Sequence, residues 1–178
     1  MARLQRQYDA GYPEASATFM WLVGDVIAGS YGPRRALRLD PLRTYLRRGI
    51  IFAQGSDYFV TPFPARYGLW ASRARETLLG TYGKTPWGTA ESIGIRDALK
   101  SYTIWAARQL FLETKIGSLE EGKYADIAVW DCDPYTASID RLKDMGCQLT
   151  VFNARIVYLR EGTRITLSRQ ADSARTRP

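Results

Sequence analysis

The chain has 178 residues, of which 46% are apolar, so it can build a hydrophobic core within about one domain. No run approaches the ~18 apolar residues of a membrane helix, and the amino end lacks the apolar core of a secretory signal. We therefore expect a cytoplasmic protein without a membrane partner. The chain contains no histidine, which excludes Ser-His and Cys-His nucleophilic catalysis within these residues.

The formal net charge is +7, and most of it lies in residues 1–89. A basic surface can bind nucleic acid, but no aromatic or glycine-rich reader motif accompanies these charges. Solvated surface charge is the favoured interpretation, with no nucleic-acid partner, and nucleic-acid binding by the basic half is the weaker option. Cys132 and Cys147 fit neither a disulfide framework nor a Cys-x-x-Cys metal site, so we expect them to be reduced.

The first clear elements are a short helix and a strand. Residues 1–32 are rich in glycine and read as loop, with one short helix near 19–26. Asp40 can cap a helix that Gly49 would end in a left-handed conformation, and the apolar run at 50–53 then predicts a buried strand at 50–54. This order of helix, glycine and strand is typical of a parallel α/β sheet.

The strand is followed by a polar exit, Gly55-Ser56-Asp57, and then by Pro62 and Pro64, which cannot continue a central strand. Helical spacing predicts a helix over 65–79 and, after a loop at 80–90, a longer one over 92–111 that Ser92 would cap.

The character of the sequence changes at Lys115. A turn near 120–123 precedes a mostly buried strand at 125–131, and two further strands are predicted at 148–152 and 155–159. Asn153-Ala154 joins the last two strands. A type I′ turn needs positive φ at both positions, which makes Ala154 a local misfit. Asp126 and Asp131 are expected to be structural charges, and Glu120 and Glu121 to be solvated.

Three stretches together resemble the carboxyl-terminal part of a metal-dependent amidohydrolase. They are GSD at 55–57, ALKSYT with AAR at 98–108, and KIGSLEEGKYADIAV at 115–129. The third is the most specific, and residues 155–158 resemble the closing strand of the family. More narrowly, residues 30–160 resemble the amidohydrolase family 3 branch, which includes enzymes similar to N-substituted formamide deformylase.

The resemblance implies an α/β fold. Residues 1–114 would be the carboxyl-terminal part of a (β/α)8 TIM barrel, namely its last strand, at 50–54, and its helices. Residues 115–167 would add strands of a small composite β-sandwich, and 168–178 would be a disordered tail. A barrel of this type takes ~250 residues, so we expect the chain to be a carboxyl-terminal fragment.

The resemblance also implies a role for Asp57. In the complete enzyme it would lie beside a divalent, zinc-type metal and accept the proton of a water that attacks a C–N bond. The family takes its other ligands from histidines on earlier strands, and this sequence has none. A zinc-type ion needs three or four ligands, so we expect this chain alone to bind no metal and to be inactive.

Two functions stay open on these grounds. The chain could belong to a hydrolase of small amide-type substrates that needs a complementing amino-terminal half, or it could be a non-catalytic interaction or assembly module derived from the fold. The aromatic residues Trp70, Trp87, Tyr102 and Trp105 are expected in the core. A partial barrel would also leave apolar surface and open sheet edges exposed.

Overall fold

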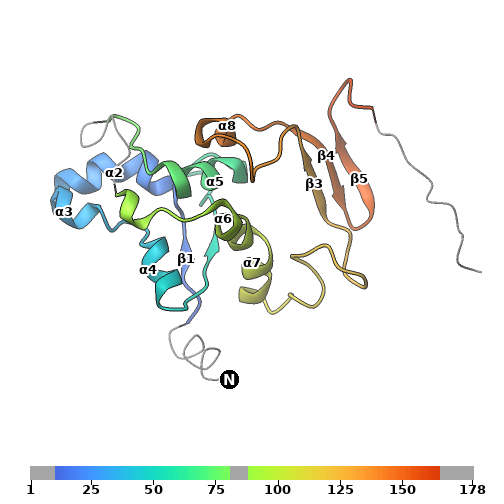
Figure 1. Ribbon diagram of the computed structural model, residues 1–178, viewed down its shortest axis with the longest axis horizontal. Coiled ribbons are helices and arrows are strands. Elements are labelled where there is room, and N and C mark those ends of the chain that lie inside the picture. The colour runs from blue at the N-terminus through green and yellow to red at the C-terminus, as the bar shows by residue number, and fades with distance from the viewer. Residues whose placement is uncertain (1–10, 81–87, 165–178) are drawn as a thin grey trace, which may run out of the picture.

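The computed structural model describes residues 11–80 and 88–164, which form a helical part and a three-stranded sheet (Figure 1). The expected disordered tail at 168–178 and Trp87 lie outside these ranges. The helices are α2 (Thr18–Tyr31), α3 (Pro33–Ala36), α4 (Leu42–Arg47), α5 (Ala65–Ala74), α6 (Ile95–Tyr102), α7 (Ile104–Gln109) and α8 (Ile139–Lys143), with a 3-10 turn at Thr89–Glu91. The strands are β1 (Glu14–Ala15), β2 (Ala53–Gln54), β3 (Ile127–Trp130), β4 (Cys147–Phe152) and β5 (Arg155–Leu159).

The helical part is organised around a short parallel pair of strands, β1 and β2, with Glu14 opposite Ala53 and Ala15 opposite Gln54. Parallel strands need a crossover connection, and α2, α3 and α4 supply it. The predicted strand at 50–54 is confirmed only for its last two residues. The short helix predicted near 19–26 is confirmed, although α2 is longer, with 14 residues. The prediction of loop was wrong at β1.

The core of this part surrounds Phe52, which is fully buried just before β2. Its ring contacts those of Tyr45 and Trp105, with centroids 5.8 and 5.7 Å away. Trp70 and Trp105 are buried, as predicted, and Tyr102 packs against the same cluster. The apolar run at the end of the predicted strand therefore fills the space between strands and helices.

Two predicted helix boundaries need correction. Asp40 does not cap α4, because it has a positive φ of 48° and its carboxylate accepts a hydrogen bond from Ser16 instead. Gly49 does adopt the predicted left-handed conformation, with φ 74°. The helix predicted over 65–79 ends at Ala74, since Arg75 takes a left-handed backbone conformation with φ 53°.

The helix predicted over 92–111 is in fact two helices, α6 and α7, separated at Thr103 (φ −128°, ψ −103°). Ser92 does not cap the first one; its hydroxyl donates to the carbonyl of Arg73 at 2.8 Å. Gly117 packs tightly against the start of α7, where an added Cβ would lie 2.7 Å from the Cβ of Ala107. The segment after α7 thus folds back onto the break.

The second sheet has the antiparallel order β3-β4-β5. The two-residue turn between β4 and β5 is confirmed: Asn153 and Ala154 have φ 46° and 62°, so Ala154 does occupy the unfavourable left-handed position. The prediction that 125–131 is mostly buried was wrong, because β3 has no buried residue and two of its four residues are exposed. Strand β5, at the edge of the same sheet, is exposed along its length. Within the described ranges this one sheet is all that is seen of the expected β-sandwich.

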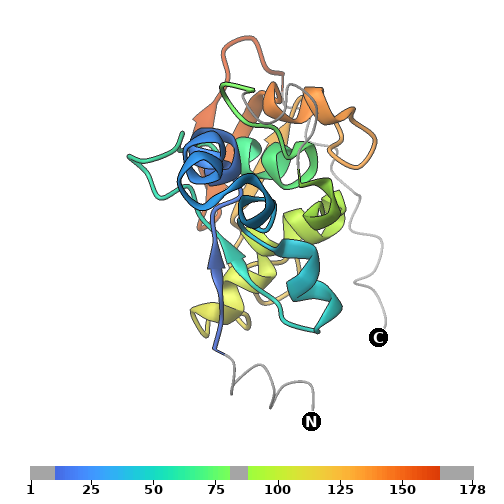
Figure 2. The ribbon, with the colours of Figure 1, turned by 90° about the vertical axis from the view of Figure 1, so that its left-hand side faces the viewer.

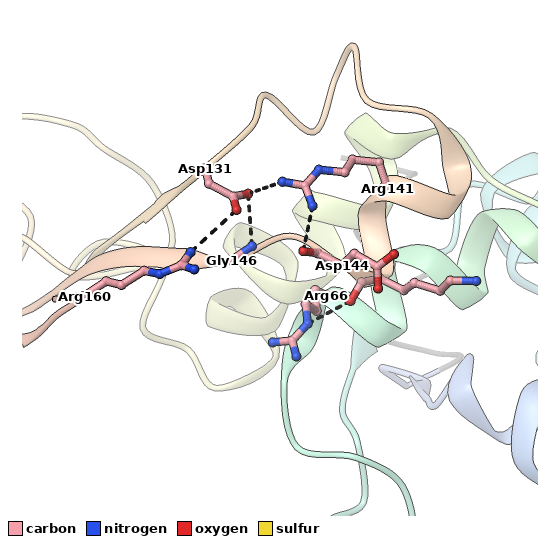
Figure 3. Close-up of polar contacts among 7 residues, drawn as sticks. Arg66, Asp131, Arg141, Asp144, Gly146 and Arg160 are labelled. Carbon is pink, nitrogen blue, oxygen red and sulfur yellow. Dashed lines mark hydrogen bonds and ion pairs between the residues drawn. The ribbon is translucent and has the colours of Figure 1, made fainter. Parts of the chain in front are cut away.

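Helix α8, which the sequence patterns did not predict, is tied to the sheet by Asp131 (Figure 3). The Asp131 carboxylate accepts a hydrogen bond from the amide of Gly146 at 3.0 Å and pairs with Arg141 at 3.0 Å and Arg160 at 3.8 Å. On the other side, Arg66 of α5 donates to the carbonyl of Lys143 at 2.9 Å. Asp131 is therefore structural, as predicted.

Asp126 is structural as well, because it accepts a hydrogen bond from the amide of Asn153 at 2.7 Å. No helix in the described ranges combines the length and the apolarity that crossing a membrane requires.

The contact between α5 and α6 generates a stability prediction at Gly68. A Cβ at this position would overlap the hydroxyl oxygen of Tyr102 and lie 2.5 Å from its Cζ. We expect Gly68→Ala to lower the free energy of unfolding by about 1–3 kcal/mol, despite the better helix propensity of alanine. Gly29→Ala in α2 is the control, because nothing lies within 4 Å of its added Cβ, and it should raise stability by up to ~1 kcal/mol. Denaturant unfolding measures both, and equal stabilisation by the two substitutions would contradict this packing.

Candidate functional site

A cleft of about 400 Å³ opens where the two parallel strands end. It is lined by residues from three separate segments: Glu14, Ala15, Ser16, Phe19, Asp40, Gly55 and Asp57. The carboxyl ends of neighbouring parallel strands are the edge at which α/β proteins place their ligands. The cleft is therefore the candidate site of this chain.

A chain of hydrogen-bonded hydroxyl groups connects the residues that follow β2 to the start of α2. Ser16 Oγ donates to the carbonyl of Gly55 at 2.9 Å and lies 3.2 Å from Thr18 Oγ1. Thr18 Oγ1 lies 2.8 Å from Thr61 Oγ1, and Thr61 in turn donates to the carbonyl of Ser56. Thr18 and Thr61 are buried, so this hydroxyl chain, from Ser16 to Thr61, holds residues 55–61 in one conformation.

Asp57, the residue that the sequence predicted as functional, lies in this fixed exit. It is exposed and has a left-handed backbone conformation, with φ 47°, which aspartate tolerates better than most residues. Its carbonyl accepts a hydrogen bond from the amide of Val60 at 2.6 Å. Glu14 lies close to this exit, because a Cβ added at Gly55 would lie 3.2 Å from Glu14 Oε1.

Asp40 is the second carboxylate held in place at the cleft. Its Oδ1 accepts a hydrogen bond from the amide of Ser16 at 3.3 Å, while its buried Oδ2 has no hydrogen-bond partner. Burial raises the pKa of Asp40 to about 6, although the Ser16 amide and the charge of Arg75 oppose the shift.

Arg75 is fully buried next to Asp40. Its guanidinium donates to the carbonyls of Leu39 at 2.7 Å, Asp40 at 3.2 Å and Gly88 at 3.2 Å. Burial lowers the pKa of Arg75, and the charge of Asp40 counteracts this effect. A buried cation thus organises the loop that carries Asp40 to the cleft.

Sequence reasoning missed Glu14, Ser16 and Asp40 as cleft residues. Glu14 and Ser16 accompany a strand of only two residues inside a segment read as loop, and Asp40 was interpreted as a helix cap.

The implied metal can be tested against these residues. Among residues 11–80 and 88–164, no three or more His, Cys, Asp or Glu side chains are grouped so that they could hold a metal ion. A zinc-type ion takes three or four protein ligands, so the described residues do not by themselves fit it.

Comparison with protein families gives one match over most of the chain. The model described as Amidohydrolase family matches residues 2–158. The chain belongs to the amidohydrolase family. The resemblance to the family 3 branch that the GSD, ALKSYT and KIGSLEEGKYADIAV stretches indicated is thereby confirmed.

Known amidohydrolase-family relatives match only over part of their own length. The chain is 29% identical over 127 residues to N-substituted formamide deformylase of Arthrobacter pascens, covering 71% of this chain and 23% of that protein. It is 29% identical over 109 residues to imidazolonepropionase of Sphingopyxis alaskensis, covering 61% and 24%. The chain therefore spans about a quarter of the curated relatives that it matches.

Solved structures agree at the level of the fold. An amidohydrolase from Thermotoga maritima superimposes with a TM-score of 0.51 and 22% identity, covering 78% of this chain and 34% of that one. An uncharacterized metal-dependent hydrolase from Pyrococcus horikoshii gives a TM-score of 0.59 and 18% identity, covering 78% and 28%. The α/β class is confirmed, and closure into an eight-stranded barrel stays a prediction.

The half-buried Asp40, with its buried Oδ2, generates a pH prediction. The unfolded chain loses this proton near the ordinary pKa of 3.8, but the folded chain keeps it until about 6. The folded state therefore binds more protons between these values, so the free energy of unfolding falls as the pH rises through this window, by about 2 kcal/mol. In Asp40→Asn this contribution should vanish, and the variant should be the more stable protein at pH 7.

Denaturant unfolding at pH 4 and pH 7 compares the two proteins, with Asp97→Asn, at a half-exposed carboxylate of α6, as the control. The Asp97 variant should keep the pH dependence of the parent. An unchanged pH dependence in Asp40→Asn would contradict the assignment.

Proposed function

We propose that this chain supplies the carboxyl-terminal part of the catalytic site of a hydrolase that cleaves C–N bonds in small amide-type molecules. The observation that carries the proposal is the position of Asp57: it follows β2 directly and lines a cleft at the carboxyl ends of two neighbouring parallel strands. Membership of the amidohydrolase family supports the reaction class. The similarity to N-substituted formamide deformylase of Arthrobacter pascens supports a substituted amide as the substrate.

In this proposal, residues 1–114 form part of the barrel, with β1 and β2 as adjacent barrel strands, and residues 115–167 form a segment of a composite β-sandwich. The parallel pairing of β1 with β2, and the separate sheet β3-β4-β5, support that division.

Asp57 is the proposed proton acceptor for the attacking water. Its side chain is exposed to the cleft, while the backbone on either side is fixed by the hydroxyl chain from Ser16 to Thr61. A positioned carboxylate of this kind contributes typically 10²–10⁴-fold to a rate. Histidine ligands for a metal would have to come from residues outside this sequence, either in a longer chain or in a second polypeptide.

A non-catalytic assembly module is the second candidate. The exposure of β5, which presents Ile156, Val157 and Tyr158 along an edge strand, favours association with another chain or segment. An assembly module would bind its partner without any dependence on Asp57, and this difference separates the two candidates.

The test is hydrolysis of N-substituted formamides by the chain joined to, or mixed with, its complementing amino-terminal part. We expect Asp57→Asn to reduce kcat at least 100-fold without changing the unfolding midpoint, because the side chain is exposed. Asp97→Asn changes a half-exposed carboxylate of α6 that does not line the cleft, so it is the control and should keep full activity. Full activity of the Asp57 variant would rule out its proposed role, and a complex that forms but hydrolyses no amide would favour the assembly module.

A further inference from the structure

A second cavity, of about 420 Å³, lies where α5, α8, the start of β4 and the end of β5 meet. Figure 1 and Figure 2 both show α8 lying above α5, and the short segment 144–146 connects α8 to β4. None of the described residues that line this cavity also lines the cleft at Asp57. The cavity is therefore separate from the candidate catalytic site, and it lies between the helical part and the three-stranded sheet.

Positively charged side chains dominate the lining of this cavity. Among the described residues, Arg66, Lys143 and Arg160 line it together with one carboxylate, that of Asp144, so the formal net charge of the lining is +2. Figure 3 shows Arg66 and Arg160 approaching the chain at Gly146 from different elements. Like charges that separate elements bring to one cavity repel one another, and a bound anion would reduce this repulsion.

The guanidinium group of Arg66 is oriented but not neutralised. Its Nε donates to the carbonyl of Lys143 at 2.9 Å, and one Nη donates to the hydroxyl of Tyr67 at 3.3 Å. Its Cζ lies 4.7 Å from the centre of the Tyr67 ring. Within residues 11–80 and 88–164, no carboxylate forms an ion pair with Arg66. The remaining N–H groups of Arg66 are therefore held in place with their positive charge unpaired.

The other two cations have only distant carboxylate partners. Arg160 Nη1 lies 3.8 Å from Asp131 Oδ2, which is beyond hydrogen-bond distance, and Asp131 already pairs with Arg141 at 3.0 Å. Lys143 Nζ lies 3.6 Å from a carboxylate oxygen of Asp140. Both side chains therefore keep hydrogen-bond donors for a ligand in the cavity.

We propose that this cavity binds the phosphate group of a small phosphate monoester, and that Arg66 and Arg160 donate hydrogen bonds to its oxygens. A planar guanidinium group matches phosphate with two parallel hydrogen bonds. The net charge of +2 favours a dianion such as phosphate over a monovalent carboxylate, because Coulomb attraction grows with the charge of the ligand.

The size and walls of the cavity favour a monoester over the free anion. Its volume lies in the range of ~300–1,000 Å³ that is usual for small-molecule sites, which leaves room for an organic group beside the phosphate. Tyr67 and Tyr158 line the cavity as well, and their rings can pack against such a group. Because Arg66 belongs to α5 and Arg160 follows β5, the bound ligand would connect the helical part to the sheet.

The first test uses the full chain and three probes, inorganic phosphate, phenyl phosphate and acetate, at one ionic strength and at pH 8, where the phosphates are dianions. Binding is followed by NMR of the backbone amides. We expect inorganic phosphate to shift the amides of residues 144–147 and 158–160 at a concentration about tenfold lower than acetate, and phenyl phosphate at a lower concentration still. Both phosphates should also raise the thermal unfolding midpoint, because they bind the folded chain.

The second test uses variants of the charged residues. Arg160→Gln should raise the concentration needed for both phosphates about tenfold, because it removes a charged donor. Arg155→Gln is the matched control, since Arg155 is exposed at the other end of β5 and does not line the cavity, and it should bind as the parent does. Asp144→Asn, which removes the one carboxylate among the described lining residues, should tighten phosphate binding about threefold or more.

Several results would overturn the inference. Equal binding of phosphate and acetate, or equal weakening by Arg160→Gln and Arg155→Gln, would show a response to the overall charge of the chain. Equal binding of the two phosphates would replace the monoester with the free anion as the ligand. A DNA duplex that shifts the same amides at a lower concentration than phenyl phosphate would assign the cavity to a macromolecule. None of these measurements involves hydrolysis, so their outcome is independent of the proposed function.

Discussion

The side chain of Gln54 is the interaction on which the helical part depends. It is buried at the end of β2, where its Nε2 donates to Ser101 Oγ at 2.8 Å and to Ser72 Oγ at 3.0 Å. Its Oε1 accepts a hydrogen bond from the amide of Ala17 at 3.3 Å. One amide group thus joins β2 to the start of α2, to α5 and to α6. A buried polar group left without partners costs about 1–3 kcal/mol, so these four elements are constrained to one arrangement.

This constraint passes directly to the candidate site. Gly55 follows Gln54 in the chain, and its carbonyl accepts a hydrogen bond from the hydroxyl of Ser16. Ser16 directly precedes Ala17, whose amide donates to the side chain of Gln54. The same two segments therefore meet twice, once in the core and once at the cleft. This junction fixes the chain that leads to Asp57, while the hydrogen bonds of Arg75 independently fix the loop that contains Asp40. Asp57 is exposed, but the residues that fix the backbone around it, Gln54, Thr18 and Thr61, are buried.

The sequence predicted well where a feature is local. The exit of a strand at Asp57, the two-residue turn at Asn153-Ala154 and the strands on either side of it all follow from patterns within a few residues. The resemblance to amidohydrolases adds the reaction class, which no single pattern could supply. The structure confirms the strand exit and the turn, and the comparison with protein families confirms the family.

The remaining features depend on distant contacts and could not be read in this way. β1 is two residues long and exists only because β2 lies beside it, 39 positions later in the chain. Asp40 has the sequence position of a helix cap, but its carboxylate accepts a hydrogen bond from the amide of Ser16, 24 residues earlier. No proline or glycine marks the break at Thr103, and burial of 125–131 depends on what covers the sheet rather than on the apolar residues in it.

Amide hydrogen exchange of Gln54→Leu tests the role of this junction most directly. The substitution keeps a side chain of similar volume but removes the hydrogen bonds. We therefore predict that protection from amide exchange falls about tenfold or more at the start of α2, in α5, in α6 and at the amide of Gly55. Gln148→Leu on β4 is the control and should leave these four places unchanged. A loss confined to β2, with α5 and α6 as protected as in the parent, would show that these helices are held by apolar packing alone and would contradict the role given to Gln54.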